Sequence, residues 1–304
     1  MLTHEQDGAF HWTSMHSPVQ LHLPGVGELG ALAVARAVEA DLEASEQALS
    51  RFRPAAELVR LNACQGSWVQ VSPRLYTALS AALQAFRRTG GFFDPRVLES
   101  LERYGYAGAP HGGGPLPAGF GPWLERRPRA RQVCALAALD LGGIGKGLAV
   151  RWGARIAAHV AWNFLLNAGG DLIAAGPGPE GRGWQVGVED PLQQGDLVAA
   201  LQLPEGGAVC TSSIATHRWQ SGGAWVHHLI DPRSGRPGGE GLLAVTVVGR
   251  DPAWTEVWSK ALFLQGRRDI ARNCGRRAVL WISVDGTIAM SDAMRGYVFW
   301  RRRG

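Results

Sequence analysis

Four glycines crowd the segment LDLGGIGKG, with Asp140 just before them and Lys146 among them. Glycine lets a ligand approach the backbone closely, and the free N–H groups at a helix start favour anions. The segment lacks the four-residue spacer and the Ser or Thr after the lysine that a Walker loop requires. It therefore predicts either an anion site, to which Lys146 adds charge, or glycines that let two helices pack closely. Asp140 either caps this helix or accepts hydrogen bonds from a ligand.

Glu256 and Lys260 lie four residues apart in WTEVWSKALFLQG, on one face of a predicted helix. This order favours a surface ion pair, worth about 0.2–0.5 kcal/mol. Lys260 and Lys146 are also the only lysines among 31 basic residues. Lysine carries a compact ammonium and arginine a wide, planar guanidinium. The two lysines therefore either mark places where a guanidinium does not fit or remain by chance. A surface pair and a site role both remain open for Glu256 and Lys260.

A third polar segment, TSSIATHRWQSGGAWVHHLIDPRSG, combines hydroxyl groups with His217, His227 and His228. A histidine three residues before an Asp-Pro turn can be held in one orientation. A neutral imidazole near pH 7 is the natural base for a serine or threonine hydroxyl. His228 is therefore a candidate base, although a lone histidine is more often a structural group.

The segment GGFFDP places two aromatic residues beside a carboxylate. Adjacent side chains in an extended segment point to opposite sides, so one of Phe92 and Phe93 can face the core while the other packs against a flat ring. Asp94 precedes Pro95, where an Asx turn is the simplest role for its side chain.

Helical spacing of apolar residues predicts helices over residues 29–52, 73–89, 144–156 and 254–265, the second with Ser72 as its N-cap. Alternating or continuous apolar runs predict strands in NFLLNAGGDLIAAG, WQVGVEDP, LVAALQLP and AVTVVG, and Asp285-Gly286 predicts a closing hairpin. Strands and helices do not alternate regularly. The sequence therefore predicts an α+β fold with largely antiparallel sheets and not a doubly wound Rossmann sheet.

Composition is that of an ordinary enzyme, since 46% of the residues are hydrophobic and 19% charged, and the length allows one large domain or two small ones. We expect one domain over residues 1–304. Residues 105–130, rich in Gly and Pro, predict a surface excursion or a linker without regular elements. The net charge of +5 comes from scattered arginines, so no nucleic-acid partner is expected. Four widely spaced cysteines predict reduced core residues. No apolar run approaches a membrane span, and a cytoplasmic protein, or one trimmed of its leader, is expected.

Taken together, these segments in this order resemble the FAD:protein FMN transferases, the ApbE-like family. The resemblance runs from about residue 50 to residue 266. The matching segments are SRFRPAAELVRLN, GGFFDP, LDLGGIGKG, LNAGGDLIAAG, TSSIAT, HHLIDPRSGRP and EVWSKALFLQG.

The resemblance implies an ApbE-like fold and a reaction in which FAD gives its FMN half to a Thr or Ser hydroxyl of a target flavoprotein, with release of AMP. In that family Mg²⁺ bridges the FAD diphosphate. His228 would act as the base or orient the acceptor hydroxyl. Metal ligands would be the Gly143 carbonyl and the side chains of Glu256 and Lys260. Flavin and adenine contacts would fall on Met15, Phe52, Phe92, Phe93, Asp94, Asp140, Lys146 and Ile230.

The chain departs from the family's pattern at several positions. Glu256 stands where Asp is usual, and glutamate can still hold Mg²⁺. Lys260 stands where the family has Thr or another oxygen donor. An ammonium would compete with the ion or take its place against the diphosphate. Ala56 and Phe52 each remove one hydrogen-bonding group, and MHS at Met15 replaces the usual Met-Gly-Thr.

Three functions follow from these observations. The first is an Mg²⁺-dependent FMN transferase with His228 as the base. The second is a protein that binds FAD, or hydrolyses it to FMN and AMP, without transfer, because Lys260 alters the metal position. The third is an interaction module without flavin, which predicts that FAD does not raise its thermal stability.

Overall fold

The computed structural model describes residues 2–4, 9–106, 121–193, 195–215 and 217–302. A nine-stranded sheet runs through the molecule in the order β1-β2-β3-β7-β8-β11-β16-β17-β18, and each of its strand pairs is antiparallel. The strands are β1 Thr3–His4, β2 Ala9–Ser14, β3 Ser17–His22, β7 Phe164–Ala168, β8 Asp171–Ala175, β11 Gly206–Ser213, β16 Leu242–Gly249, β17 Ala278–Ser283 and β18 Ile288–Met290.

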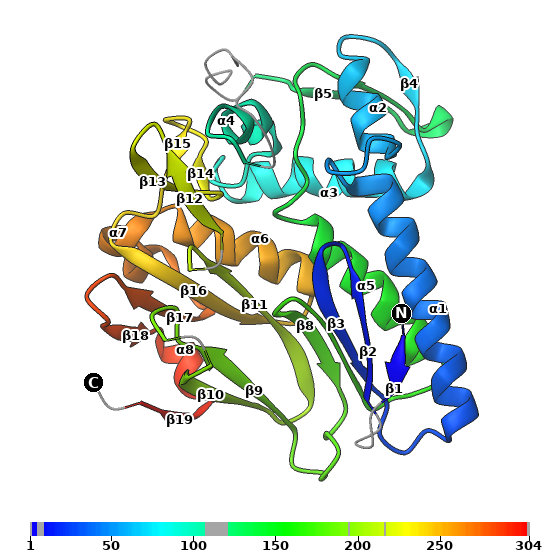
Figure 1. The fold of residues 1–304 in the computed structure, drawn as a ribbon, viewed down its shortest axis with the longest axis vertical. Helices are drawn as coiled ribbons and strands as arrows, with labels where there is room; N and C mark the ends of the chain where they lie inside the picture. The colour runs from blue at the N-terminus through cyan, green and yellow to red at the C-terminus, as the bar shows by residue number, and fades with distance from the viewer. Residues whose placement is uncertain (1, 5–8, 107–120, 194, 216, 303–304) are drawn as a thin grey trace.

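Helices cover this sheet and extend beyond it (Figure 1). The helices are α1 Glu28–Leu49, α2 Glu57–Ala63, α3 Pro73–Arg88, α4 Leu98–Arg103, α5 Gly145–Ala158, α6 Pro252–Phe263, α7 Gly266–Asn273 and α8 Asp292–Arg295. Helices α1 and α5 lie side by side along one flank, and α6 crosses the sheet near its middle. Within the described residues, no helix combines the length and apolar character that crossing a bilayer demands.

Four smaller sheets surround the central one, and their pairings are antiparallel too. Their strands are β9 Trp184–Glu189, β10 Leu197–Leu203 and β19 Val298–Arg301; β4 Val69–Gln70, β5 Leu124–Arg127 and β6 Gln132–Ala135; β12 Arg218–Ser221 and β13 Ala224–His227; β14 Ile230–Asp231 and β15 Arg236–Pro237. The predicted α+β class with largely antiparallel sheets is confirmed.

The predicted helices form, with one error at an end. Ser72 caps α3, since its hydroxyl accepts a hydrogen bond from the Leu75 N–H at 3.1 Å. Helix α1 buries Val38 and Leu42 as the apolar spacing predicted. It ends at Leu49, however, so Phe52 is not part of its stripe and is 44% exposed. Periodicity cannot locate such an end because the apolar residues beyond it continue the same spacing by coincidence.

The predicted strands and the closing hairpin also form, with Gly286 at φ 80° in the turn. Part of the expected excursion over residues 105–130 is regular, because β5 lies within it and pairs with β6, which follows it. Residues 107–120 lie outside the described residues. Three cysteines are buried, whereas Cys64 is exposed, and all four are free.

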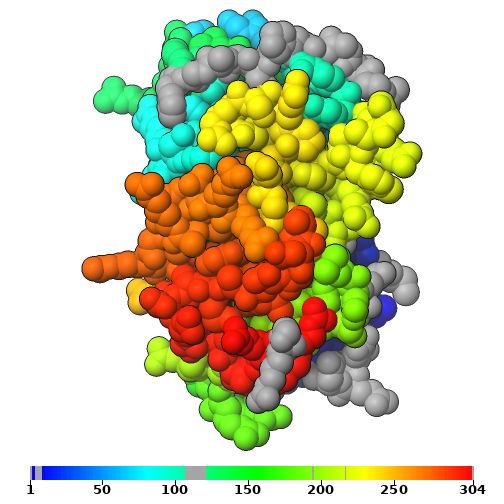
Figure 2. Space-filling view, turned by 90° about the vertical axis from the view of Figure 1, so that its left-hand side faces the viewer, coloured from blue at the N-terminus to red at the C-terminus, as the bar shows by residue number. Residues whose placement is uncertain are grey.

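Helices α5 and α6 meet near their N-terminal ends, and this contact positions the polar segments of the sequence. Asp251 caps α6 by accepting from the Trp254 N–H at 3.1 Å. Residues around β14 and β15 (yellow in Figure 2) lie between the region of α3 and α4 (cyan) and that of α6 and α7 (orange). The segments GGFFDP, LDLGGIGKG, HHLIDP and EVWSK thereby come together.

Candidate active site

Most of the predicted site residues line a single pocket. The predicted residues in its wall are Phe92, Phe93, Asp94, Asp140, Gly143, His228, Ile230 and Lys260. Val97, Leu101, Pro232 and Leu264 complete the lining. The pocket has a volume of about 20 Å³, room for about one water molecule. A flavin ring can therefore reach these side chains only from the open side, or after side chains at the rim move.

The two phenylalanines lie in bends, pack against different core clusters and both line the pocket, so the predicted split between the core and a flat ring is not seen. Phe93 is buried in the cluster around α3, and Phe92 packs against the cluster around α6 with Arg233 over its ring at 4.4 Å. Asp94 forms the predicted Asx turn: its Oδ1 accepts from the Arg96 N–H at 2.9 Å. Its Oδ2 also pairs with the Arg96 guanidinium at 2.6 Å. Sequence reasoning missed Arg96.

Asp140 is held from two sides. Its Oδ1 accepts from the Gly142 N–H at 2.5 Å, and its Oδ2 lies 2.6 Å from Nε of Arg51. The preceding residue is also fixed, since Asn62 donates to the Leu139 carbonyl at 2.8 Å and accepts from its N–H at 2.9 Å. Sequence reasoning did not single out Arg51 or Asn62, although both lie in SRFRPAAELVRLN.

The glycines of LDLGGIGKG serve both of the roles that the sequence left open. A Cβ on Gly147 would lie 2.6 Å from Cα of Ala253 and from the Pro252 carbonyl, so this glycine permits the close contact between α5 and α6. Gly143 instead lines the pocket. A Cβ there would lie 2.6 Å from Nζ of Lys260, which shows that the lysine side chain rests directly against this glycine.

A buried ionic network lies beneath the glycines. Lys146 pairs with Asp171 at 2.5 Å, and Glu256 accepts from the Gly147 N–H at 2.7 Å. Burial, and after it the charge of Asp171, raise the pKa of Glu256 to about 8. Burial opposes the charge on Lys146, but Asp171 and Glu256 raise its pKa overall. Asp171 was missed, although it lies in LNAGGDLIAAG.

The surface ion pair between Glu256 and Lys260 does not form. Glu256 is 5% exposed and its carboxylate accepts a hydrogen bond from α5, while the Lys260 ammonium has no hydrogen-bond or ion-pair partner among the described residues. Burial lowers the pKa of Lys260. The described residues also contain no group of three or more His, Cys, Asp or Glu that could hold a metal ion. With an ammonium beside Gly143, these side chains do not fit the Mg²⁺ that the resemblance implied.

His228 lies in an aromatic group above the pocket. Its Nδ1 is buried without a hydrogen-bond partner in the described structure. Tyr106 stacks on its ring at 6.0 Å between centroids, and His217 meets it edge-on at 5.0 Å. Burial and the nearby charge of Lys260 hold the pKa of His228 well below 6.5. The imidazole is therefore neutral at physiological pH and able to accept a proton.

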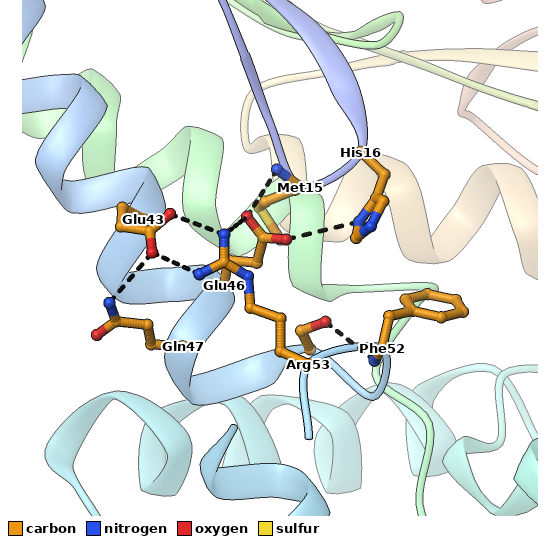
Figure 3. Close-up of polar contacts among 8 residues, drawn as sticks. Met15, His16, Glu43, Glu46, Gln47, Phe52 and Arg53 are labelled. Carbon is orange, nitrogen blue, oxygen red and sulfur yellow. Dashed lines mark hydrogen bonds and ion pairs between the residues drawn. The ribbon is translucent and has the colours of Figure 1, made fainter. Parts of the chain in front are cut away.

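Met15 and Phe52 are not among the residues that line the pocket. Figure 3 shows their surroundings. Met15 and His16 form the turn between β2 and β3, both at positive φ, and the Met15 N–H donates to Oε2 of Glu46 at 3.0 Å. Arg53 donates to the same carboxylate at 2.9 Å. His16 meets the Phe52 ring edge-on at 5.6 Å.

The Met15–Phe52 group is connected to the pocket through Arg51. The Arg51 guanidinium lies 4.2 Å above the Phe52 ring and also pairs with Asp140, which lines the pocket. Lys146 and Glu256, the remaining predicted residues, lie behind the glycine segment and not in the pocket wall.

Known proteins share the sequence pattern and the fold of this chain. The ApbE family model matches residues 15–280. The chain is 32% identical over 256 residues to the FAD:protein FMN transferase of Rhodobacter capsulatus, a match that covers 79% of this chain but only 48%, about half, of that protein. It is 24% identical over 300 residues to the FAD:protein FMN transferase of Escherichia coli K12, with 87% of this chain and 80% of that protein covered.

Solved structures share the fold. The ApbE protein of Thermotoga maritima superposes with a TM-score of 0.85 over all of both chains, at 23% identity. The apo flavinyl transferase ApbE of Pseudomonas stutzeri gives a TM-score of 0.79 at 22% identity and covers 98% of this chain and 99% of that one. Since the family model spans most of the sequence and the architecture agrees, the chain belongs to the ApbE family.

Proposed function

We propose that this chain is an FAD:protein FMN transferase that acts as one domain. The observation that carries the proposal is the convergence of His228, Lys260 and Gly143 on the same pocket, beside Phe92 and Phe93. These residues supply a base, a cation, an open backbone approach and aromatic surface, the groups that a flavin dinucleotide and an attacking hydroxyl require. The names of the curated relatives support the same activity.

The reaction follows from these groups. A Thr or Ser hydroxyl of a target flavoprotein attacks the FMN-side phosphorus of FAD, and an oxygen–phosphorus bond forms while the bond to AMP breaks. His228 accepts the hydroxyl proton, for which its neutral imidazole is suited. Phe92, Phe93 and Ile230 pack against the flavin, and Asp94 and Asp140 orient its polar edge or the adenine. No step is routed through Mg²⁺, because the donor groups around Lys260 do not fit one.

Met15, Phe52 and Lys146 have supporting roles in this proposal. Met15 and Phe52 provide apolar surface at the far end of the dinucleotide, where Arg51 links them to Asp140. Lys146, paired with Asp171, lies in the first turn of α5, where the free N–H groups and the helix dipole favour the diphosphate.

Mass spectrometry tests this function directly. The chain is incubated with FAD and a flavoprotein that carries an exposed Thr or Ser, and the acceptor is then weighed. We expect a mass gain of one FMN and one AMP released for each acceptor modified. An acceptor of unchanged mass, despite bound FAD, would refute transfer.

One observation favours a second function, FAD binding or hydrolysis without transfer. Lys260 lies where the resemblance places a metal ligand, and it rests against Gly143. If FMN and AMP appear in solution while the acceptor mass is unchanged, the chain is a hydrolase. If neither product appears while FAD stays bound, it is a flavin-binding protein.

A further inference from the structure

Lys260 differs from the other cations around the pocket because no carboxylate of the described residues forms an ion pair with its ammonium, although the charge of Asp140 acts on it. Arg51 pairs with Asp140 at 2.6 Å, and Arg96 pairs with Asp94 at 2.6 Å. Both carboxylates that line the pocket are thus already engaged. The Lys260 ammonium has no such partner in the part of the chain that the structure describes, although it is half-buried and lines the pocket. A cation held in this way favours an anionic ligand.

The acidic residue one helical turn before Lys260 does not serve as that partner. Glu256 lies one helical turn before Lys260 on α6, but its carboxylate accepts from the Gly147 N–H at 2.7 Å and so faces the start of α5. Lys146 is likewise occupied, since it pairs with Asp171 at 2.5 Å. Lys260 is therefore the cation in the pocket wall that remains available to a ligand.

The position of the ammonium also excludes a second cation at the same place. Its Nζ lies against the α-carbon of Gly143, whose carbonyl the resemblance assigned to the metal. A divalent ion beside that backbone would meet an ammonium that donates three hydrogen bonds and offers no lone pair when charged. The ammonium itself can donate to phosphate oxygens as a point charge.

We propose that the Lys260 ammonium takes the place of a divalent cation in this chain, so that the diphosphate of FAD binds to it without metal. This inference rests on the proposed function for the identity of the ligand. Lys260 remains protonated and forms no covalent bond. It donates hydrogen bonds to the diphosphate and stabilises the charge that develops as AMP leaves.

FAD binding in the presence and absence of metal tests the inference. The affinity of the full chain for FAD is measured by flavin fluorescence, once with EDTA and once with excess Mg²⁺. We expect the two dissociation constants to agree within about twofold, and Lys260→Met to weaken binding roughly tenfold to a hundredfold in EDTA, the loss typical of a hydrogen bond to a charged group. In Lys260→Thr, Mg²⁺ should recover binding severalfold.

The control is Arg182→Met, which removes an 81% exposed cation far from the pocket and should leave FAD binding unchanged. If Lys260→Met fails to fold, Gly143→Ala replaces it, because its Cβ would displace the end of the lysine and should weaken binding as well. Wild-type binding that requires Mg²⁺ would overturn the inference, and so would Lys260→Met binding as tightly as wild type.

The outcome is separable from that of the proposed function. Metal-independent FAD binding without modification of any acceptor would refute transfer and leave the role of Lys260 intact. Transfer that stops in EDTA would support the function and refute the role of Lys260. A Lys260→Thr protein without any response to Mg²⁺ would show that position 260 does not face the phosphates, and this also overturns the inference.

Discussion

His228 combines an accessible position in the pocket wall with an environment that keeps it neutral. Its predicted role as a base depends on one imidazole nitrogen that accepts a proton in the transition state. We expect His228→Asn to lower the transfer rate about a hundredfold to ten-thousandfold, the usual contribution of a general base, while FAD still binds. Mass spectrometry of the acceptor gives the rate. His159→Asn, an exposed histidine at the end of α5, is the matched control and should transfer at the wild-type rate.

The pKa of His228 provides a second test at this scale. Burial and then Lys260 lower this pKa, so the base stays neutral as the pH falls through 6.5, and protonation disables it only at lower pH. Lys260→Met removes the positive neighbour and should raise the pKa of His228. Titration of the His228 ring protons by NMR, in the FAD-free proteins, measures the change. A pKa that is unchanged or lower in the variant would contradict the proximity of the two side chains.

Individual site residues were predictable where a local motif marked them, and not where their partners were distant. The Asx turn of Asp94 follows from neighbouring residues alone. The pairing of Asp140 with Arg51 does not, because 89 positions separate them and only the fold brings them together. The burial of Glu256 could not be predicted from the sequence either, since its spacing from Lys260 is also typical of a surface ion pair.

The contact between helices α5 and α6 positions the site residues, and Gly147 determines how closely the two helices approach. A Cβ at position 147 would meet backbone atoms of α6 at 2.6 Å, and backbone cannot move aside easily. We expect Gly147→Ala to lower the free energy of unfolding by about 1–3 kcal/mol, the usual cost of overpacking. Thermal or urea unfolding measures the loss.

Gly30→Ala is the control for this substitution. Gly30 lies in the first turn of α1, is exposed, and its added Cβ would meet only a side-chain methyl at 3.5 Å. Alanine is the better helix former, so this variant should be unchanged or more stable by up to about 1 kcal/mol. Equal losses of unfolding free energy in both variants would show that the close approach of α5 and α6 is not the cause of the destabilisation.

At this scale, the sequence predicted elements whose signals are local. The Ser72 cap, the alternation in β9 and the Asp285-Gly286 turn each predicted an element that forms. The extension of α1 to Phe52 was wrong because the helix ends at Leu49. Strand β5 was missed because its pairing with β6 depends on a partner strand, and its own four residues carry no alternation of apolar and polar side chains.

The ionic network of Lys146, Asp171 and Glu256 joins three elements of the molecule, α5, β8 and α6. The folded state holds a proton on Glu256 up to a pH of about 8, whereas the unfolded chain loses it near 4.5. The stabilisation from this group is therefore fully present below pH 4.5 and is lost as the pH rises through 8.

Glu256→Gln tests this dependence. Glutamine keeps an oxygen that can accept from the Gly147 N–H but carries no titrating proton. We expect the melting temperature of the variant to rise relative to that of wild type as the pH increases from about 5 to 8.5. The rise should be several degrees for each kcal/mol of unfolding free energy that the wild type loses. Scanning calorimetry at several pH values measures the difference. A difference that stays constant with pH would exclude a raised pKa for Glu256.

The central claim is that a dinucleotide's phosphates bind at the glycine-lined start of α5, opposite Lys260 of α6. A crystal structure of the complex with FAD tests it most directly. We predict phosphate oxygens at hydrogen-bonding distance, about 2.7–3.2 Å, from Nζ of Lys260, next to Gly143, with the flavin ring against Phe92 and Phe93. FAD bound elsewhere, with Lys260 still resting on Gly143 and the pocket closed, would contradict the claim.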